Sequence, residues 1–340
     1  MSRLRKLKNC HSVFKDKTKI IKAKLSITNH TTSAIQIAVL RATTRSARSP
    51  PPDHLISALV SFSHTARHSA LACNVTIINR LHHHHQPNAY VALKSLITLH
   101  HLIVSGSFVH NEQLELAFRY KVSSATRFDF LNLSRFVDDT DSQSREFSLW
   151  AQWYARVLEN NVSTTTILGC YMSLSKAEIE KKREKLKLSL YADLFKEIES
   201  MVSTVEEISK APRLSHCRKN DIIYEVIKLV GEDYRKIQYH TTSRLIELSD
   251  RAKNLSTGEL NGLTRCLERL EKCEAGLTEL FANRMRNEPF WKLQTELKTK
   301  LVRLKEEKEV KSGSWKMIEY ETGSTQLKKQ LSRSLLLLWV

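Results

Sequence analysis

Apolar residues recur at every third or fourth position along most of this 340-residue chain, a spacing that lines one face of an α-helix. Residues 88–104 are apolar around most of the helical circumference, so we expect that helix to be buried between neighbours. In the first half the pattern predicts helices over 12–26, 32–43, 54–65, 66–84, 88–104, 110–124, 145–160 and 163–170. In the second half it predicts longer, charge-rich helices over 176–209, 219–254, 258–283 and 286–310.

The long helices determine the expected architecture. Within 176–209 an apolar residue stands at every fourth position, at Leu186, Leu190, Leu194 and Ile198. Helices of this length suit a layered bundle or a helical solenoid. The chain has only 8 glycines and 6 prolines, well below the average usage of about 7% and 5%. Because β-sandwiches and barrels need many turn residues, we predict an all-α protein.

The main interruption of the helical pattern lies at 46–53, where three of the prolines stand in a row. Asp53 follows them and is predicted to cap the helix that starts at His54. This segment is therefore expected to form a short loop between two rigid helices.

Charge is distributed unevenly along the chain. The 54 Lys and Arg residues outnumber the 36 Asp and Glu residues, which gives a formal net charge of +18. Residues 1–48 contain 12 of the basic residues and a single acid, Asp16. A basic end on a more balanced body indicates an anionic partner, either a nucleic acid or the cytoplasmic leaflet of a membrane.

The cysteines and the apolar runs indicate in which cellular compartment the protein is located. The six cysteines include no Cys-x-x-Cys pair, which is typical of reduced intracellular thiols. The chain begins with a basic stretch rather than an apolar leader, and no run approaches the roughly 20 apolar residues of a membrane span. We therefore expect a cytoplasmic protein that can be peripheral to a membrane.

Candidates for catalysis or metal binding are weak. The four consecutive histidines 82–85 point about 100° apart in a helix, so they favour a helix end over a metal site. His100 is expected to be a hydrogen-bonded core residue, and Asp138, Asp139 and Asp141 to be solvated loop acids. No glycines have the spacing of a phosphate-binding loop. We predict no enzyme activity, no cofactor and no metal site.

The basic residues around the proline loop are the strongest candidates for function. Short loops between rigid helices can hold several cations against a phosphorylated head group with little ordering cost. The alternative is a solvated basic face without a ligand. The candidate residues for binding such a head group are Arg41, Arg45, Arg48, His54, Lys15, Lys17, Lys22 and Lys24.

Several stretches of the sequence, taken together, resemble a known family. Arg41-Ala42-Thr43, followed after ten residues by His54, resembles the Lys-Ala-Thr…His signature of ANTH domains, the phosphoinositide-binding domains of clathrin assembly proteins. Further similar stretches follow the chain order: Phe14-Lys15-Asp16-Lys17, Val91 to Leu96 continuing through His100 to Gly106, Leu131 to Phe136 with Asp138-Asp139, and Trp153 to Glu159. The chain looks most like the short plant members of this ANTH/ENTH-domain family.

The resemblance implies a right-handed superhelical solenoid of stacked helices, with long helices at its C-terminal end. It divides the chain into a basic segment 1–11, an ANTH-like domain 12–305 and a short tail 306–340. In this family a basic tip binds phosphatidylinositol 4,5-bisphosphate or a related lipid, the later helices can bind a vesicle SNARE, and the tail recruits clathrin heavy chain and adaptors.

Two departures from the family pattern are visible. Pro51, Pro52 and Asp53 stand where the family places lysines, and the segment 306–340 contains no Asp-Pro-Phe, Asn-Pro-Phe or Asp-Leu-Leu motif for clathrin recruitment. The expected function is a membrane adaptor of clathrin-coated pits and vesicles, at the plasma membrane or the Golgi apparatus. The alternatives are a helical nucleic-acid-binding protein that uses the same basic end, and a helical scaffold without lipid contact.

Overall fold

The structure is a computed structural model, and every regular element that it describes is helical. The described residues are 16–21, 30–45, 49–82, 87–106, 112, 131, 133–168, 184, 186–213, 220–281 and 289–310. No β-strand occurs among them, which confirms the all-α prediction. The predicted helix 110–124, the histidines 83–85 and the tail beyond residue 310 lie outside these ranges.

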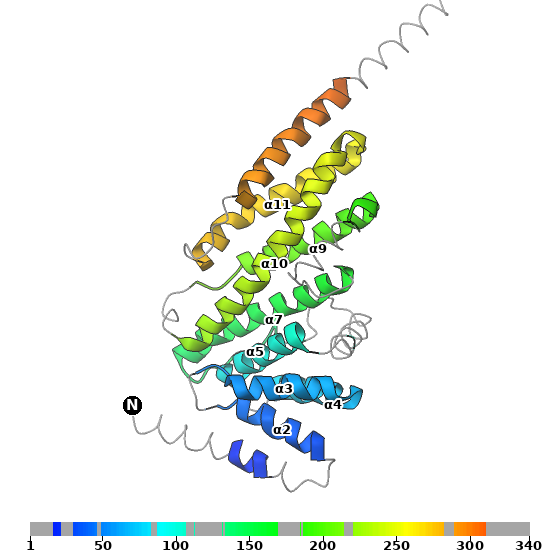
Figure 1. The fold of residues 1–340 in the computed structure, drawn as a ribbon. Helices are drawn as coiled ribbons and strands as arrows, with labels where there is room; N and C mark the ends of the chain where they lie inside the picture. The colour runs from blue at the N-terminus through cyan, green and yellow to red at the C-terminus, as the bar shows by residue number, and fades with distance from the viewer. Residues whose placement is uncertain are drawn as a thin grey trace, which may run out of the picture.

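The helices are stacked in layers from one end of the molecule to the other (Figure 1). The N-terminal layers contain α2 (His30–Ala42), α3 (Asp53–Thr65), α4 (Arg67–Leu81) and α5 (Ala89–Ser105). α2 packs on α3 and α4, and α5 packs on both of these and on α7. The predicted solenoid of stacked helices is thereby confirmed.

The N-terminal layers are built around α5. Thirteen of its seventeen residues are buried, because its apolar side chains point toward neighbours on nearly every side. The Asn88 side chain accepts a hydrogen bond from the Val91 amide (3.0 Å) and caps the first turn. At the other end the helix stops before Gly106, as the sequence predicts. The helix is thus fixed at both ends within the stack.

A loop acid at the start of α5 corrects one prediction. Asp138 is buried, at 1% exposure, and it accepts a hydrogen bond from the Ala89 amide (2.9 Å) and from the Thr140 amide (3.1 Å). It therefore stabilises the helix N-terminus, where unpaired amides favour a negative charge. The expectation of a solvated loop is wrong for Asp138, although Asp139 is exposed and forms an ion pair with Arg145 (3.0 Å).

α7 (Ser142–Leu168) is a single helix of 27 residues, so the predicted interruption between 160 and 163 is wrong. The two asparagines in that interval find partners inside the helical stack. Asn160 donates to the Arg156 carbonyl one turn earlier (2.9 Å), and Asn161 donates to the buried carboxylate of Asp233 (2.5 Å). The helix continues because both side-chain NH2 groups find acceptors within the stack, so neither asparagine draws the backbone out of the helix.

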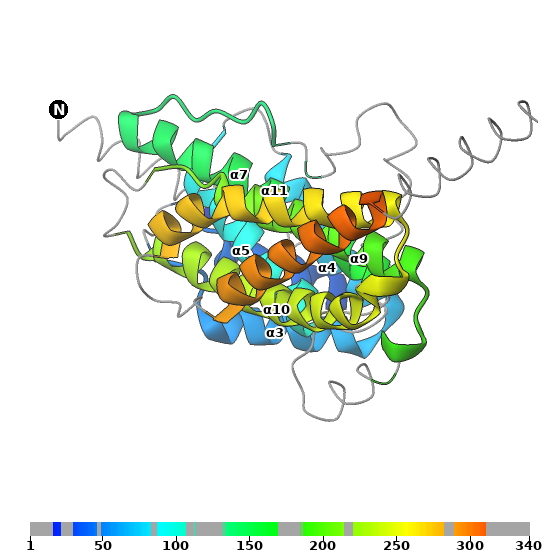
Figure 2. The ribbon, with the colours of Figure 1, turned by 90° about the horizontal axis from the view of Figure 1, so that it is seen from above.

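The C-terminal layers contain α9 (Tyr191–Ser209), α10 (Asp221–Arg251), α11 (Thr257–Phe281) and the helix 289–310. α9 packs on α7, α10 and α11. Seen from above, α11 and the 289–310 helix overlie α10 and α5 (Figure 2). One hydrophobic core extends through all the layers, from Ile35 in α2 to Leu301 in the last helix.

The expected long helix 176–209 is interrupted within its described part. Residues 189 and 190 are not helical, Leu190 has extended backbone angles (φ −70°, ψ 153°), and its side chain is 71% exposed. Arg251, at the end of α10, donates to the carbonyls of Leu186 (3.0 Å), Lys187 (2.7 Å) and Ser189 (2.8 Å). These bonds satisfy the carbonyls of a helical turn that ends before α9 begins.

A buried polar network connects three layers. His100 of α5 is 1% exposed and lies between the Tyr154 hydroxyl of α7 (Nδ1 to Oη, 2.7 Å) and the Asp233 carboxylate of α10 (Nε2 to Oδ2, 2.9 Å). Burial among apolar neighbours raises the pKa of the Tyr154 hydroxyl, so it remains protonated. The prediction of a hydrogen-bonded core histidine is confirmed.

Within the described part of the chain, no helix combines the length and apolarity needed to cross a membrane. In the same residues, His, Cys, Asp and Glu side chains form no group of three that could hold a metal ion.

Candidate functional site

The end of α2 explains the Arg-Ala-Thr triplet in physical terms. Arg41 is exposed, whereas Ala42 and Thr43 are buried at 1% and 0% exposure. The Val39 carbonyl accepts both the Thr43 amide (2.9 Å) and the Thr43 hydroxyl (2.7 Å), so this residue closes the last turn of the helix. The triplet thus exposes the charge of Arg41 and buries Thr43 at the point where the loop begins.

The proline loop leads directly into α3. Pro52 is the residue before the helix, and its carbonyl accepts hydrogen bonds from the amides of Leu55 (3.0 Å) and Ile56 (3.2 Å). No side chain caps this helix, so the prediction that Asp53 is the cap is wrong: Asp53 is the first helical residue. Its charge still favours the helix N-terminus. His54 follows and is exposed.

The helical segment 16–21 lies against the α2–α3 loop. Asp16, at 5% exposure, accepts a hydrogen bond from the Arg45 amide (3.0 Å) through Oδ2. The neighbouring Lys17 is exposed. This contact places the lysine-bearing first helix beside the basic loop, as the sequence suggests.

Four charged side chains meet beneath the loop, and we call this set the cation cluster: Asp16, Arg45, Arg80 and Lys94. Arg80 Nη2 lies 2.9 Å from Asp16 Oδ1, and Arg45 Nε lies 3.6 Å from the same oxygen. Lys94 Nζ contacts the carbonyl (3.3 Å) and the hydroxyl (3.4 Å) of Thr44. The cluster therefore joins the first helix, the loop, α4 and α5.

Arg80 fixes the loop as well as the carboxylate. Its Nε donates to the Thr43 hydroxyl (3.1 Å), and its Nη2 also donates to the Thr43 carbonyl (2.9 Å). Because these bonds come from a buried side chain of α4, the backbone that leaves α2 is held in one position.

Positive charge exceeds negative charge in the cation cluster. All four side chains are at least nine-tenths buried, at 10% exposure for Arg45, 8% for Asp16 and 4% for Arg80. Burial, which outweighs the attraction of Asp16, lowers the pKa of Lys94 to about 8. Burial and the charge of Arg80 also lower the pKa of Arg45, against the opposing effects of Asp16 and Asp138. Among the described residues, one carboxylate thus contacts two of the three cations, Arg45 and Arg80, while Lys94 contacts Thr44.

The predicted site residues differ in where their charges lie. Arg41, His54 and Lys17 are exposed, whereas Arg45 turns inward and pairs with Asp16. Arg48, Lys15, Lys22 and Lys24 lie outside the described residues. The sequence reasoning did not identify Arg80 and Lys94. One signal was available, because Lys94 is the only Lys, Arg, Asp or Glu in the otherwise apolar helix α5.

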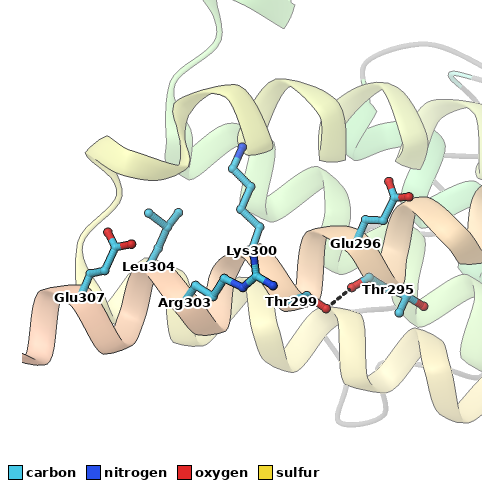
Figure 3. Close-up of a pocket in the computed structure, with 7 residues that line it drawn as sticks. All are labelled: Thr295, Glu296, Thr299, Lys300, Arg303, Leu304 and Glu307. Carbon is cyan, nitrogen blue, oxygen red and sulfur yellow. Dashed lines mark hydrogen bonds between the residues drawn. The ribbon is translucent and has the colours of Figure 1, made fainter.

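A second candidate surface lies at the far end of the stack. A groove of about 440 Å³ runs along the 289–310 helix (Figure 3). Lys300 reaches across to α10, where Nζ contacts the carbonyl (2.7 Å) and the hydroxyl (3.0 Å) of Ser249. The groove is lined by Thr295, Glu296, Thr299, Lys300, Arg303, Leu304 and Glu307.

An all-α stack with a basic loop at one end and long helices at the other defines a class of helical solenoid domain. The model of the ANTH domain matches residues 34–284, which run from the first turns of α2 to just beyond the end of α11. The chain therefore belongs to the ANTH domain family.

Two relatives from Arabidopsis thaliana cover most of the chain. The "Putative clathrin assembly protein At4g40080" is 33% identical over 84% of this chain and 78% of its own length. The "Putative clathrin assembly protein At5g10410" is 30% identical over 84% of this chain and 83% of its own length. Among solved structures, the ENTH domain of epsin-2 in complex with phosphatidylinositol 4,5-bisphosphate matches with a TM-score of 0.49. It is 16% identical, over 75% of this chain and 93% of that chain.

Proposed function

We propose that this protein is a membrane adaptor of clathrin-mediated vesicle formation that binds phosphoinositides through its N-terminal tip. The observation that carries the proposal is the end of α2, where Arg41 and His54 are exposed at the ends of two helices and the backbone at Thr43 is held by Arg80. Because both side chains stand on helix ends, they can meet a phosphorylated head group with little ordering of their backbone on binding. Membership of the ANTH domain family and the clathrin-assembly names of its relatives support the same function.

The charge distribution also supports a membrane partner. The N-terminal 48 residues carry 12 cations and one acid, and that acid, Asp16, is buried in the cation cluster. Of the described cations in this stretch, Lys17 and Arg41 are exposed, so their charges face solvent. Each basic residue near an anionic leaflet contributes about 1 kcal/mol of binding free energy.

Vesicle sedimentation tests the lipid-binding proposal. Phosphatidylcholine vesicles containing phosphatidylinositol 4,5-bisphosphate are compared with vesicles of equal total charge containing phosphatidylserine. We expect preferential binding to the former, and Arg41→Ala is expected to weaken it about fivefold. The matched control is Arg265→Ala, which removes the same charge from an exposed position on α11. Equal binding by both variants would contradict the assignment of Arg41 to the lipid site.

A nucleic-acid partner is the competing function, and duplex DNA serves as its probe. Binding to DNA that exceeds vesicle binding, and that falls steeply with salt, would replace the lipid proposal. We expect vesicle binding to be the stronger of the two at physiological ionic strength, because Arg41 and His54, on the ends of α2 and α3, add head-group contacts to the general attraction.

We assign a vesicle SNARE to the C-terminal layers as the protein partner of the adaptor. The groove on the 289–310 helix and exposed apolar side chains such as Ile246 (47%) and Val302 (43%) support a helical partner there. Pull-down with a recombinant SNARE helix tests this, with Val302→Glu expected to reduce capture. Clathrin heavy chain is the second partner, tested by the same assay on the full chain, and loss of clathrin capture on deleting 306–340 would place its site there.

A further inference from the structure

The cation cluster has more hydrogen-bond donors than acceptors. Arg45 Nε and Arg80 Nη1 are buried and find no hydrogen-bond partner among the described residues. Buried guanidinium nitrogens are ordinarily paired, because an unmet donor retains most of its desolvation cost. The contacts of Lys94 Nζ with Thr44 are long, at 3.3 and 3.4 Å. The cluster therefore offers more hydrogen-bond donors than the single carboxylate that contacts it can accept.

The guanidinium groups of Arg45 and Arg80 converge on one oxygen of the Asp16 carboxylate. Asp16 Oδ1 lies 2.9 Å from Arg80 Nη2 and 3.6 Å from Arg45 Nε, while Oδ2 is used by the Arg45 amide. Asp138 is the other acid that acts on Arg45, but its carboxylate is bonded to the Ala89 and Thr140 amides at the start of α5. Among the residues that the structure describes, Asp16 is the one acid in direct contact with Arg45 and Arg80.

We propose that the cation cluster is an anion-exchange site in which the Asp16 carboxylate occupies the place of a phosphate group. A phosphate of the inositol head group displaces it when the protein binds. The inference rests on the proposed lipid-binding function, which it deepens by naming the residues that exchange. A phosphomonoester carries up to two negative charges and three terminal oxygens, against one charge and two oxygens for a carboxylate. It can therefore satisfy Arg45 Nε and Arg80 Nη1 together.

The exchange has a structural consequence for the first helix. Asp16 is the residue through which the 16–21 segment holds the Arg45 amide and the Arg80 guanidinium. When the phosphate replaces this carboxylate, the segment loses both attachments. The adjacent Lys17, already exposed, becomes free to follow the membrane surface. Binding of the anion and release of the 16–21 segment are thus one event.

Removing the competing carboxylate tests the exchange. Asp16→Asn keeps the side-chain shape but removes the charge, so we expect phosphoinositide vesicles to be bound about tenfold more tightly. The variant should at the same time unfold at a lower temperature, because the cations lose their counter-charge. Soluble inositol 1,4,5-trisphosphate should restore that temperature. If Asp16 is only structural, Asp16→Asn lowers both stability and affinity, and the proposal is overturned.

Asp53→Asn is the matched control, since it removes the same charge from an exposed position beside the same loop. General electrostatic attraction predicts similar gains for both variants, limited to about fivefold on charged vesicles. The exchange predicts that only Asp16→Asn gains affinity for the soluble trisphosphate. Equal gains in the two variants would contradict it.

Hydrogen exchange on the wild-type protein provides a test that needs no variant. Titration with inositol 1,4,5-trisphosphate should accelerate amide exchange in 16–21 while the amides of α5 remain protected. Inorganic phosphate is the second arm: a response to it alone shows that a free phosphate suffices, and a response only to the inositol phosphate or to vesicles assigns the site to the head group. Unchanged or slower exchange in 16–21 with all three ligands would refute the displacement.

The two proposals fail in different ways. If wild-type protein ignores phosphoinositide vesicles but the soluble anion releases 16–21, the membrane function is wrong and the exchange site stands. If vesicles bind, but neither Asp16→Asn nor the anion has the expected effect, the exchange is wrong and the membrane function stands.

Discussion

The arginine guanidinium groups at the two ends of this protein have opposite surroundings. In the C-terminal layers Arg269 of α11 bonds both oxygens of Glu206 (2.8 and 2.6 Å) and also contacts Glu199. Its pKa is raised, chiefly because of the hydrogen bonds with Glu206. At the N-terminal end Arg45 shares a single carboxylate with Arg80, and its pKa is lowered by burial.

The difference distinguishes a structural ion pair from a candidate binding site. Arg269 has more carboxylates than it needs, so nothing further is required to stabilise its charge. Arg45 and Arg80 have buried donors without a partner among the described residues. A ligand that binds there and accepts these donors would offset their desolvation cost. Counting acceptors for each buried cation thus indicates function more directly than counting cations on the surface.

The largest expected effect concerns Lys94 and its dependence on pH. Burial lowers its pKa from 10.5 to about 8, so the folded protein releases this proton before the unfolded chain does. Stability should therefore rise as the pH increases from 8 to 10.5, by about 3 kcal/mol from this residue. Urea unfolding of wild type and Lys94→Met at several pH values measures the effect. A stability difference between the two proteins that does not change with pH would contradict it.

Close packing in the C-terminal layers gives the next largest effect. A Cβ atom at Gly276 of α11 would lie 2.5 Å from the Ser209 carbonyl oxygen of α9, so Gly276→Ala should destabilise the fold by about 2 to 3 kcal/mol. Gly262→Ala is the control on the same helix. No atom lies within 4 Å of a Cβ there, and removing glycine from a helix should stabilise it by about 0.5–1 kcal/mol. Thermal unfolding compares them, and the same sign for both would show that α9 and α11 are less closely packed.

The smallest effect compares the two arginines directly. Arg269→Met should destabilise the protein by about 2 kcal/mol, because it leaves two carboxylates without their donor. Arg45→Met should change stability by less than about 0.5 kcal/mol, since the lost attraction to Asp16 is offset by relief of repulsion from Arg80. Denaturant titration of both variants measures the difference. Equal losses of stability in the two variants would contradict the distinction between a structural ion pair at Arg269 and a candidate binding site at Arg45.

Much of the fold could be predicted from periodicity, because most helices bury one continuous apolar stripe. The errors arose where tertiary contacts override local pattern. Leu190 fits the apolar pattern of every fourth residue in 176–209. It is nevertheless exposed, because Arg251 binds the carbonyls just before it and the helix is interrupted there. Asn161 looks like a helix interruption until Asp233 is brought to it from 72 residues away.

Only part of the candidate site could be predicted from the sequence. A basic loop near the N-terminus could be found by counting charges, and the family resemblance identified Arg41 and His54. The partners of Arg45 could not be found in this way, since Arg80 lies 64 residues from Asp16 and Lys94 lies 50 residues from Thr44. Only folding brings these side chains together, and only the structure shows which charges face outward.

The buried bond between His100 and Asp233 has a mechanical consequence. α10 has 31 residues, about 46 Å of helix, and its Asp233 is tied to α5 and α7 through side chains with no access to water. Sliding α10 by one turn would strand that carboxylate in an apolar setting, so the layers cannot change register gradually. The bond therefore fixes the register of α10 against α5 and α7, and a partner bound on α10 is held in one position relative to those layers.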